Sequence, residues 1–472
     1  MHHPLPCADT VSDWVAQECA ALVLGDRRRV ATTARLLSAI ALRPAGTVTQ
    51  VFAQDAAGQQ AAYDWAANPA IPFASIATAA HHATASRCAL DAFVYVPVDG
   101  TDLTYTDTTG ERGTGPIADG AHPARGFFQV SALAVSPDGV TAGLCARSVW
   151  VRPESRVVVR CEARRRPLEE KESWHYHRAI LQAEAVITRG APNTRPWFQI
   201  DRAGDTVDML LASIRARRWI TVRACYDRKV ISLQAAHLKE LGDRTAVAFA
   251  ATLALPACEG RDARVTVLQV RYAEVQLRLC EQVGSKEWSA PVWTVWVREV
   301  NPPANCTPIT WTLHTTRPVE CAQDALEVVN GYCVRWRIEE FHRTWKSGGT
   351  RVEDSQLRDA HALWKWGALL SAAATRLMRL RDLSRTTPAS PAKEHFSAAE
   401  LEAIVALRDP RDHTPGQPPT LGRVVRWLAE LGGYAGSSAK NPPGVTVLAR
   451  GMERVEAVVT ALENMRRIQR DP

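Results

Sequence analysis

The chain has 472 residues, and its 57 Lys and Arg against 50 Asp and Glu give a net charge of +7 and a pI near 8.9. Hydrophobic residues make up 46% and charged residues 23%, which are ordinary globular values and exclude a largely disordered chain. No run of about 18 apolar residues occurs, so the sequence predicts no membrane span. The positive charge favours a polyanionic partner without requiring one.

The eleven cysteines indicate a reducing compartment. They are scattered from Cys7 to Cys333 and form neither a CxxC pair nor a cluster with histidine. An odd number without a pattern argues against a disulfide framework and against a zinc site. The N-terminus also lacks the charged-then-apolar pattern of a secretory signal. We therefore predict a cytoplasmic protein.

Residues 1–75 predict a small module of three helices, the third near residues 55–67. The second helix begins in the segment LGDRRRVATTARL, so Arg27, Arg28 and Arg35 lie in its first half. Arginines at the start of a helix can place that helix on DNA. They are equally typical of a solvated, charged helix end, and the sequence leaves both interpretations open.

The middle of the chain predicts a mixed α/β core. Residues 92–107 indicate two strands joined by a turn at Asp99-Gly100. Further elements are predicted in the order strand, strand, helix, strand, helix, strand, at 127–136, 141–152, 168–188, 197–200, 205–217 and 219–226. Strands followed by alternating helices and strands are typical of an α/β core.

A different pattern occupies residues 230–305, where apolar residues alternate with a period of two and predict an inserted antiparallel sheet. The chain then returns to the core with a strand at 311–316 and a long helix from near Pro318 to about Trp345. Later elements are a helix at 363–383, linker-like breaks at 386–395 and 410–419, and helices at 421–431 and 449–470.

The long helix carries the most informative side chains. At 100° per residue, with Tyr332 at zero, Arg335 lies at about −60°, Glu339 at about −20° and Lys346 at about −40°. Apolar residues fall on the opposite side, which predicts an outward-facing row of phenol, guanidinium, carboxylate and ammonium. Such a row can hold phosphates and a cation, or it can be an ordinary solvated helix face.

Two further carboxylates come directly after predicted strands. Asp99 follows VYVPV and Asp201 follows WFQI, and strand ends at the edge of an α/β core are where ligands collect. Mg²⁺ is held by such carboxylates. Asp102, Asp107 and Asp205 are near competitors, and Asp205 is predicted to be a helix N-cap. A single Asp after a strand is more often a turn former than a ligand.

These residues resemble a known family. YCVRWRIEEFHRTWKSG (332–348) resembles the YREK signature of bacterial cut-and-paste DDE transposases, the transposon-five-like members of the insertion-sequence-four group. The spacing of Tyr, two residues, Arg, three residues, Glu, six residues and Lys is matched without a gap. DGTDLTYT (99–106) resembles the first aspartate block, and DRAGD (201–205) resembles the second, with Gly204 a departure. Both ends of the chain are similar to those of the family.

The resemblance implies an α/β fold with an RNase H-like catalytic core over residues 76–385. An antiparallel β-sheet subdomain would be inserted in it at about 230–305. The core would be flanked by a helical DNA-binding domain (1–75) and a C-terminal helical dimerisation domain (386–472).

The resemblance also implies a reaction. Asp99, Asp201 and Glu339 would bind two Mg²⁺ ions, for which Mn²⁺ can substitute, and no nucleotide cofactor or covalent protein–DNA intermediate is expected. The steps would be nicking of the transposon end, formation of a hairpin on it, reopening of the hairpin and joining to target DNA.

DNA contacts are implied for further residues. Tyr332, Arg335 and Lys346 would clamp phosphates near the cleaved strand. Arg223 would help to hold the hairpin or is a simple edge-strand arginine, and Trp311 would accommodate a flipped base or is a core residue. Arg27, Arg28 and Arg35 would contact the terminal inverted repeats. The partners would therefore be double-stranded DNA, as transposon ends and target, and a second copy of the chain that pairs two ends.

Two other functions remain open at this point. A catalytically silent DNA-binding relative would act as a transposition inhibitor or a domesticated factor, and a structure-specific nuclease would use the same core. Intact acids argue against the first. Inverted repeats of about 20 base pairs flanking the coding region would favour transposition over both alternatives.

Overall fold

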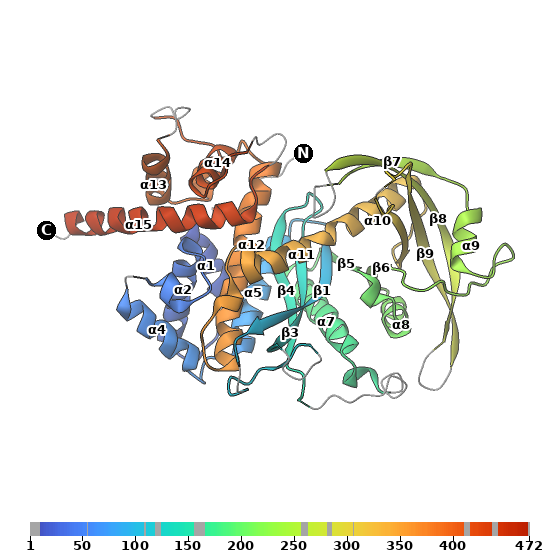
Figure 1. The fold of residues 1–472 in the computed structure, drawn as a ribbon, viewed down its shortest axis with the longest axis horizontal. Helices are drawn as coiled ribbons and strands as arrows, with labels where there is room; N and C mark the ends of the chain where they lie inside the picture. The colour runs from blue at the N-terminus through green and yellow to red at the C-terminus, as the bar shows by residue number, and fades with distance from the viewer. Residues whose placement is uncertain are drawn as a thin grey trace.

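A computed structural model describes residues 10–53, 55–107, 110–118, 124–154, 166–255, 263–280, 286–304, 306–409, 416–436 and 442–470. A central sheet runs through the molecule, with helices of both chain ends on one side of it and a long β-hairpin on the other (Figure 1). Part of the predicted loop at 410–419 lies outside the described residues.

The N-terminal helices follow their capping signals. Asp26 accepts a hydrogen bond from the backbone N–H of Arg28 at 2.8 Å and so starts the arginine-bearing helix α2. These helices are α1 (Val11–Cys19), α2 (Arg27–Leu42), α3 (Val48–Val51), α4 (Ala56–Ala67) and α5 (Phe73–Cys88). The sequence prediction missed α5, and its domain boundary at residue 75 falls inside this helix. The Ala-rich α5 is buried on several sides, against β4, α7 and α12, so it shows no amphipathic pattern.

The described strands form one mixed, ten-stranded sheet. Their order is β2-β3-β1-β5-β6-β10-β9-β8-β7, with β4 paired to β3. Their bounds are β1 (Phe93–Tyr105), β2 (Gly115–Pro116), β3 (Arg125–Val135), β4 (Thr141–Trp150), β5 (Arg195–Ile200), β6 (Trp219–Arg223), β7 (Phe249–Leu255), β8 (Arg264–Cys280), β9 (Glu287–Val300) and β10 (Thr310–Thr315). The predicted α/β class is therefore confirmed.

The predicted turn at Asp99-Gly100 is wrong, because β1 continues through both residues to Tyr105. On one side, β1 pairs with β5 in parallel only as far as Val98 and Ile200. On the other side, its antiparallel pairing with β3 continues to the end of the strand. β1 thus extends beyond β5, which leaves an edge at Asp99.

The inserted segment is antiparallel, as predicted, but it is not a separate sheet. β8 and β9 form a long hairpin with β7 at its outer edge and α9 (Leu238–Arg244) beside it. β9 pairs with β10, and β10 pairs with β6, so the hydrogen bonding continues into the core. The alternation of apolar and polar residues predicted that this segment forms strands. It carried no information about which core strand they pair with, which is β10.

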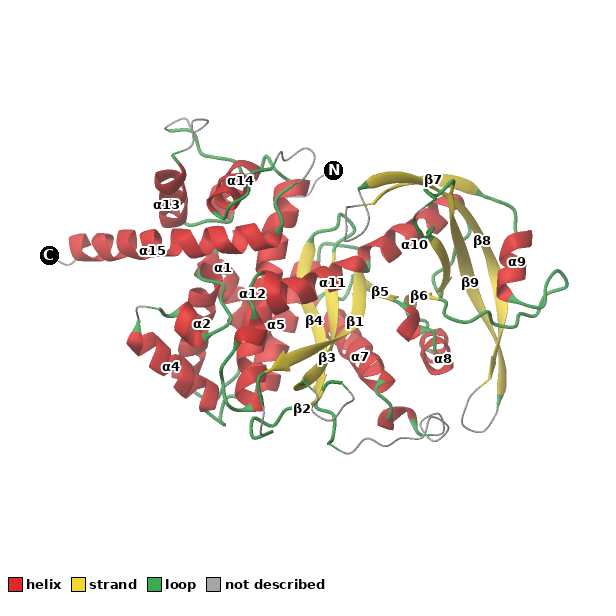
Figure 2. Cartoon of the chain, in the orientation of Figure 1, coloured by secondary structure: helices red, strands yellow, loops and turns green. Residues whose placement is uncertain are grey.

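Helices cover both faces of the sheet (Figure 2). One face packs on α7 (Ser173–Gly190) and α8 (Val207–Arg215), and the other packs on α10 (Ala322–Val334) and α11 (Trp336–Arg343). Successive side chains of β1 alternate between these faces: Val94, Val96 and Val98 lie in the core under α7, whereas Tyr95 lies in the core under α10.

The helices of the two chain ends share a single hydrophobic core. α12 (Ala360–Thr386) is almost entirely buried, and it is packed against α2, α4, α14 (Leu421–Leu431) and α15 (Val445–Arg470). The unpredicted α13 (Ala398–Arg408) also packs on α14 and α15. The two predicted helical domains are therefore joined through α12. Among the described residues, no helix combines the length and the apolar character that a membrane span requires.

Candidate active site

The two predicted aspartates lie next to each other at the edge where β1 extends beyond β5. Val98 and Ile200 are the last parallel pair, so Asp99 and Asp201 are the next residues of two neighbouring strands, whose backbones are about 5 Å apart. Asp201 then caps a 3₁₀ turn (Arg202–Gly204), because its carboxylate accepts a hydrogen bond from the N–H of Ala203 at 2.8 Å.

Glu339 approaches Asp99 from α11, and Arg335 connects the two carboxylates. The Arg335 guanidinium donates to Glu339 Oε1 at 2.6 Å and to Asp99 Oδ2 at 3.5 Å. Arg335 is only 5% exposed. Its burial opposes ionisation, but the hydrogen bond and charge of Glu339 and the charge of Asp99 outweigh it and raise the pKa of Arg335. Arg335 thus bridges Asp99 and Glu339, and Asp201 directly follows the strand beside Asp99.

Burial and nearby negative charge both oppose ionisation of the Asp99 carboxyl. Burial, and secondly the charge of Asp201, raise the pKa of Asp99 from 3.8 to about 6, with a smaller contribution from Glu339. The N–H of Gly100 and the guanidinium of Arg335 act in the opposite direction. An acid cluster of this kind is a candidate for a functional site, since positive charge added there would relieve the repulsion.

Replacing Asp99 by Asn is expected to stabilise the metal-free protein at neutral pH. The folded-state pKa of Asp99 lies above the unfolded value, so the wild type loses stability as pH rises from about 4 to about 6. The ionised group then costs on the order of 2 to 3 kcal/mol, which Asp99→Asn avoids. Urea unfolding without divalent ions should show this gain at pH 7.5 and no gain at pH 4. An equal difference at both pH values would contradict it.

The helical segment that carries the YREK residues, called the signature helix below, is irregular at two of them, Arg335 and Lys346. At Arg335 the backbone tightens, with Arg335 N–H donating to Tyr332 C=O at 3.2 Å, and this turn separates α10 from α11. At Lys346 it widens into a π-helical turn (Thr344–Gly348), with Gly349 N–H donating to Thr344 C=O at 2.7 Å. The predicted single helix from Pro318 to Trp345 is therefore wrong, and such π turns are frequent at functional sites.

The predicted outward-facing row is wrong for Tyr332 and Arg335, because the sheet covers this side of the helix. Tyr332 is 2% exposed, and its ring meets that of Trp311 edge-on at 5.1 Å between centroids. Burial raises the pKa of Tyr332, against the nearby charges of Arg335 and Arg223 and a hydrogen bond with Arg223. The phenol therefore reaches the edge where Asp201 lies.

Trp311 and Arg223 support this corner of the site. Trp311 lies on β10, is 9% exposed and belongs to the core under α10. A base-accommodating role for Trp311 stays a prediction, and in this structure it packs as a core residue. Arg223 ends β6, and its guanidinium donates to the Thr310 carbonyl at 3.4 Å.

Lys346 contacts β1 at Asp102, three residues after Asp99. Its ammonium is 3.7 Å from Asp102 and 3.4 Å from Glu353, and Glu353 also accepts a hydrogen bond from Thr104 N–H. The arginines of the N-terminal module lie on α2, in the helical part of the molecule and away from β1 and β5, the strands that position the two aspartates (Figure 1). Three of them have exposed side chains: Arg27, Arg28 and Arg35.

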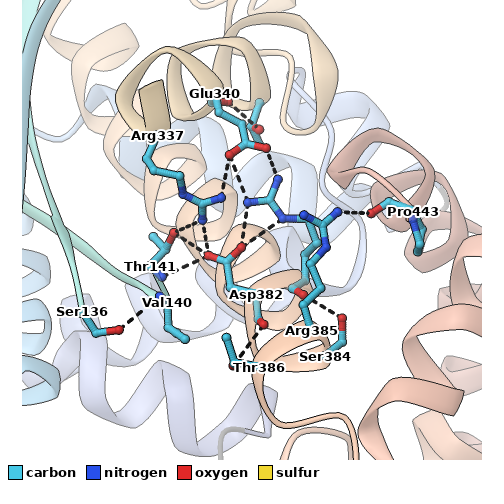
Figure 3. Close-up of polar contacts among 12 residues, drawn as sticks. Ser136, Val140, Thr141, Arg337, Glu340, Asp382, Ser384, Arg385, Thr386 and Pro443 are labelled. Atoms are coloured by element: carbon cyan, nitrogen blue, oxygen red, sulfur yellow. Dashed lines mark hydrogen bonds and ion pairs between the residues drawn. The ribbon is translucent and has the colours of Figure 1, made fainter. Parts of the chain in front are cut away.

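Glu340, the neighbour of Glu339, fixes the rotation of α11. Its carboxylate pairs with Arg337 at 2.8 Å and with Arg381 of α12, and both arginines also bind Asp382 (Figure 3). Burial opposes ionisation of Glu340, but the charges of Arg381 and Arg337 outweigh it and lower its pKa. The two adjacent glutamates therefore face different partners, and only Glu339 faces the aspartates.

Asp205 is not the predicted N-cap, because Thr206 caps α8. Asp205 is buried, accepts from the N–H groups of Cys225 and Tyr226 at 2.6 and 3.1 Å, and pairs with Arg228 at 2.6 Å. It ties the loop after β6 to the end of β5. The competitor Asp107 is also structural, since it accepts from Gly110 N–H and from the Thr114 hydroxyl.

Tyr176 also reaches Asp99, and no sequence signal pointed to it. It lies in the first turns of α7, and its hydroxyl is 3.5 Å from Asp99 Oδ1 and accepts the Gly100 N–H at 3.1 Å. Burial, and then the charges of Asp99 and Asp201, raise the pKa of Tyr176, so the phenol stays protonated. A tyrosine in an amphipathic helix has no sequence pattern that separates it from core residues.

The acids are not arranged as a ready metal site. Within the ranges that the structure describes, no three His, Cys, Asp or Glu side chains are grouped so that they could hold a metal ion.

A cavity of about 620 Å³ is lined by Asp205 and by four basic side chains, which are Lys171, Arg228, Lys229 and Arg278.

Compared with models of known protein families, the chain matches none.

Proposed function

We propose that this protein is a DNA transposase of the cut-and-paste type, with Asp99, Asp201 and Glu339 as its catalytic acids. The observation that carries the proposal is their convergence. Three acids that are separated by more than a hundred residues along the chain approach one sheet edge: Asp99 and Glu339 both pair with Arg335, and Asp201 lies beside Asp99 at the end of the neighbouring strand. The YREK spacing and both aspartate blocks place the same three residues in the active site by resemblance.

The strand arrangement supports an RNase H-like core for residues 76–385. Antiparallel β4, β3 and β1 adjoin parallel β5 and β6, and the first two acids follow the last residue pair between β1 and β5. The third acid comes from a helix that packs across β1 and β3. This core would present all three acids at one edge, where a DNA strand can approach.

The donor set fits Mg²⁺ in its chemistry. Carboxylate oxygens are the protein ligands that Mg²⁺ prefers. Burial, and secondly the charge of Asp201, raise the pKa of Asp99, and a bound cation would favour the ionised carboxylate. Arg335 lies between Asp99 and Glu339, so its guanidinium must move when ions bind there. Two bound Mg²⁺ or Mn²⁺ ions would supply Lewis acidity for an in-line displacement at a phosphodiester.

The cations around the acids suit the DNA backbone. Arg335 would exchange its carboxylate partners for a phosphate, since a guanidinium binds either in a forked geometry. Tyr332 and Arg223 lie on one side of the acids, and Lys346 lies farther along β1. A strand that crosses this edge would meet a hydroxyl or a cation on both sides of the reacting phosphate.

The exposed arginines of α2 would contact phosphates of the terminal inverted repeats, while base readout stays unassigned. A second copy of the chain would be needed to pair two ends before cleavage. The double-stranded substrate and target would be encountered in the bacterial cytoplasm.

The direct test uses the wild-type chain and DNA that carries the sequences flanking its coding region. Incubation with Mg²⁺ should produce nicks at the inverted-repeat boundary, then hairpins on the transposon end, and no product should form with EDTA. Cleavage of branched DNA regardless of its sequence would instead indicate the structure-specific nuclease. End binding without any cleavage, in Mg²⁺ or Mn²⁺, would indicate the silent relative.

A further inference from the structure

Tyr176 approaches Asp99 from the face of the sheet opposite to α11. It belongs to α7, and its ring packs against the core that lies under α7 and α8. Only its hydroxyl reaches the acids, past the end of β5. The carboxylate of Asp99 is therefore contacted from both sides of the sheet.

The two oxygens of Asp99 have different surroundings. Oδ1 accepts the Gly100 N–H at 2.8 Å and is 3.5 Å from the Tyr176 hydroxyl. Oδ2 is 3.5 Å from the Arg335 guanidinium. One oxygen is thus held by the sheet edge and α7, and the other faces the cation between Asp99 and Glu339.

Gly100 makes this contact possible. A Cβ on Gly100 would lie 3.0 Å from the Tyr176 hydroxyl oxygen, closer than ordinary contact allows. The Gly100 N–H donates both to this oxygen, at 3.1 Å, and to Asp99 Oδ1, so it links phenol and carboxylate. The protonated phenol has its own hydrogen left to donate to Oδ1.

We propose that Tyr176 is a positioning residue for Asp99, whose hydroxyl holds Oδ1 so that Oδ2 is presented to a divalent cation. The proposal deepens the proposed function and rests on it. Groups that orient a metal-ligating carboxylate typically change metal affinity by about 10- to 100-fold when removed. The effect should therefore appear in metal binding itself and not only in turnover.

The test measures Mn²⁺ binding to the full chain without DNA, by the electron paramagnetic resonance signal of free Mn²⁺. Tyr176→Phe keeps the ring and removes only the hydroxyl, and it should weaken Mn²⁺ binding by about 10-fold or more. Strand cleavage should fall at low Mg²⁺ and recover at high Mg²⁺. Binding of transposon-end DNA should stay unchanged.

Tyr105→Phe is the matched control. Tyr105 is also a buried tyrosine at the sheet, on β1 itself, and its hydroxyl has no hydrogen-bond partner among the described residues. This variant should bind Mn²⁺ as the wild type does. Gly100→Ala is a second route to the same defect, because its Cβ displaces the phenol while the tyrosine remains.

The outcomes separate the two proposals. If wild type and Tyr176→Phe bind Mn²⁺ equally while Asp99→Asn binds it more weakly, the acids form a metal site and the role of Tyr176 is wrong. If Tyr105→Phe is as defective as Tyr176→Phe, the effect is general to the sheet and the role is also wrong. If Asp99→Asn binds Mn²⁺ as the wild type does, or the wild type binds none, both proposals fail.

Discussion

Glu339→Gln is expected to stop strand cleavage while leaving the binding of transposon ends intact. The amide keeps the size of the side chain and can still accept a hydrogen bond from Arg335, but it removes the negative charge that acts on Asp99. Loss of one electrostatic group at a reacting centre costs about 10² to 10³ in rate, and loss of a metal ligand should cost at least as much.

A nicking assay on end-labelled DNA measures this effect, and a gel-shift assay measures binding. The matched control is Glu340→Gln, one residue along the same helix. Its carboxylate binds Arg337 and Arg381 instead of facing the acids, so it should lower stability and largely retain cleavage at low temperature. Equal loss of cleavage in both variants, or wild-type cleavage by Glu339→Gln, would remove Glu339 from the proposed site.

Asp382→Ala is expected to cause the largest loss of stability. Asp382 is 3% exposed and accepts from Arg337, Arg381 and both the N–H and the hydroxyl of Thr141 (Figure 3). Its removal leaves the buried Arg381 and the half-buried Arg337 with Glu340 as their remaining carboxylate partner. Breaking a buried ion pair from one side costs about 3 to 5 kcal/mol, because the remaining charge stays buried.

Urea unfolding followed by tryptophan fluorescence measures this change. Asp243→Ala is the control, since its ion pair with Arg298 at 2.7 Å is about half exposed on both sides and should contribute less than about 1 kcal/mol. A change below about 1 kcal/mol for Asp382→Ala would mean that Glu340 alone satisfies both arginines.

Local rules could predict only part of the candidate site. Asp201 follows a short apolar strand, and Glu339 lies four residues after Arg335 on a helix, so strand ends and helical spacing made both of them candidates. The same patterns fit a turn former and a solvated helix face, and the resemblance to the transposase family was needed to single out the acids. Asp99 was found for a partly wrong reason. Its strand does not end there, but its neighbour β5 does, and no local pattern reveals that one strand is longer than the strand beside it.

The burial of the signature helix was not predictable in the same way. A helical wheel assumes a regular helix with one solvent face, whereas α10 is packed against the sheet and the backbone hydrogen bonding after it changes at Arg335 and again at Thr344–Gly348. Tyr332 and Arg335 are buried as a result. Tyr176 illustrates the general limit, because its contact with Asp99 spans 77 positions of the chain and depends on the end of a third segment.

Hydrogen-bonded strand pairing is continuous from β1 to β7, so the inserted hairpin and the strands that position the aspartates belong to one sheet. The insert cannot swing on a hinge without breaking the pairing of β9 with β10, so its hairpin keeps a constant offset from Asp99 and Asp201. On the proposed function, a DNA duplex that contacts this hairpin would be cut at a fixed distance from the contact. That distance would stay the same when the base sequence between the contact and the cut is changed.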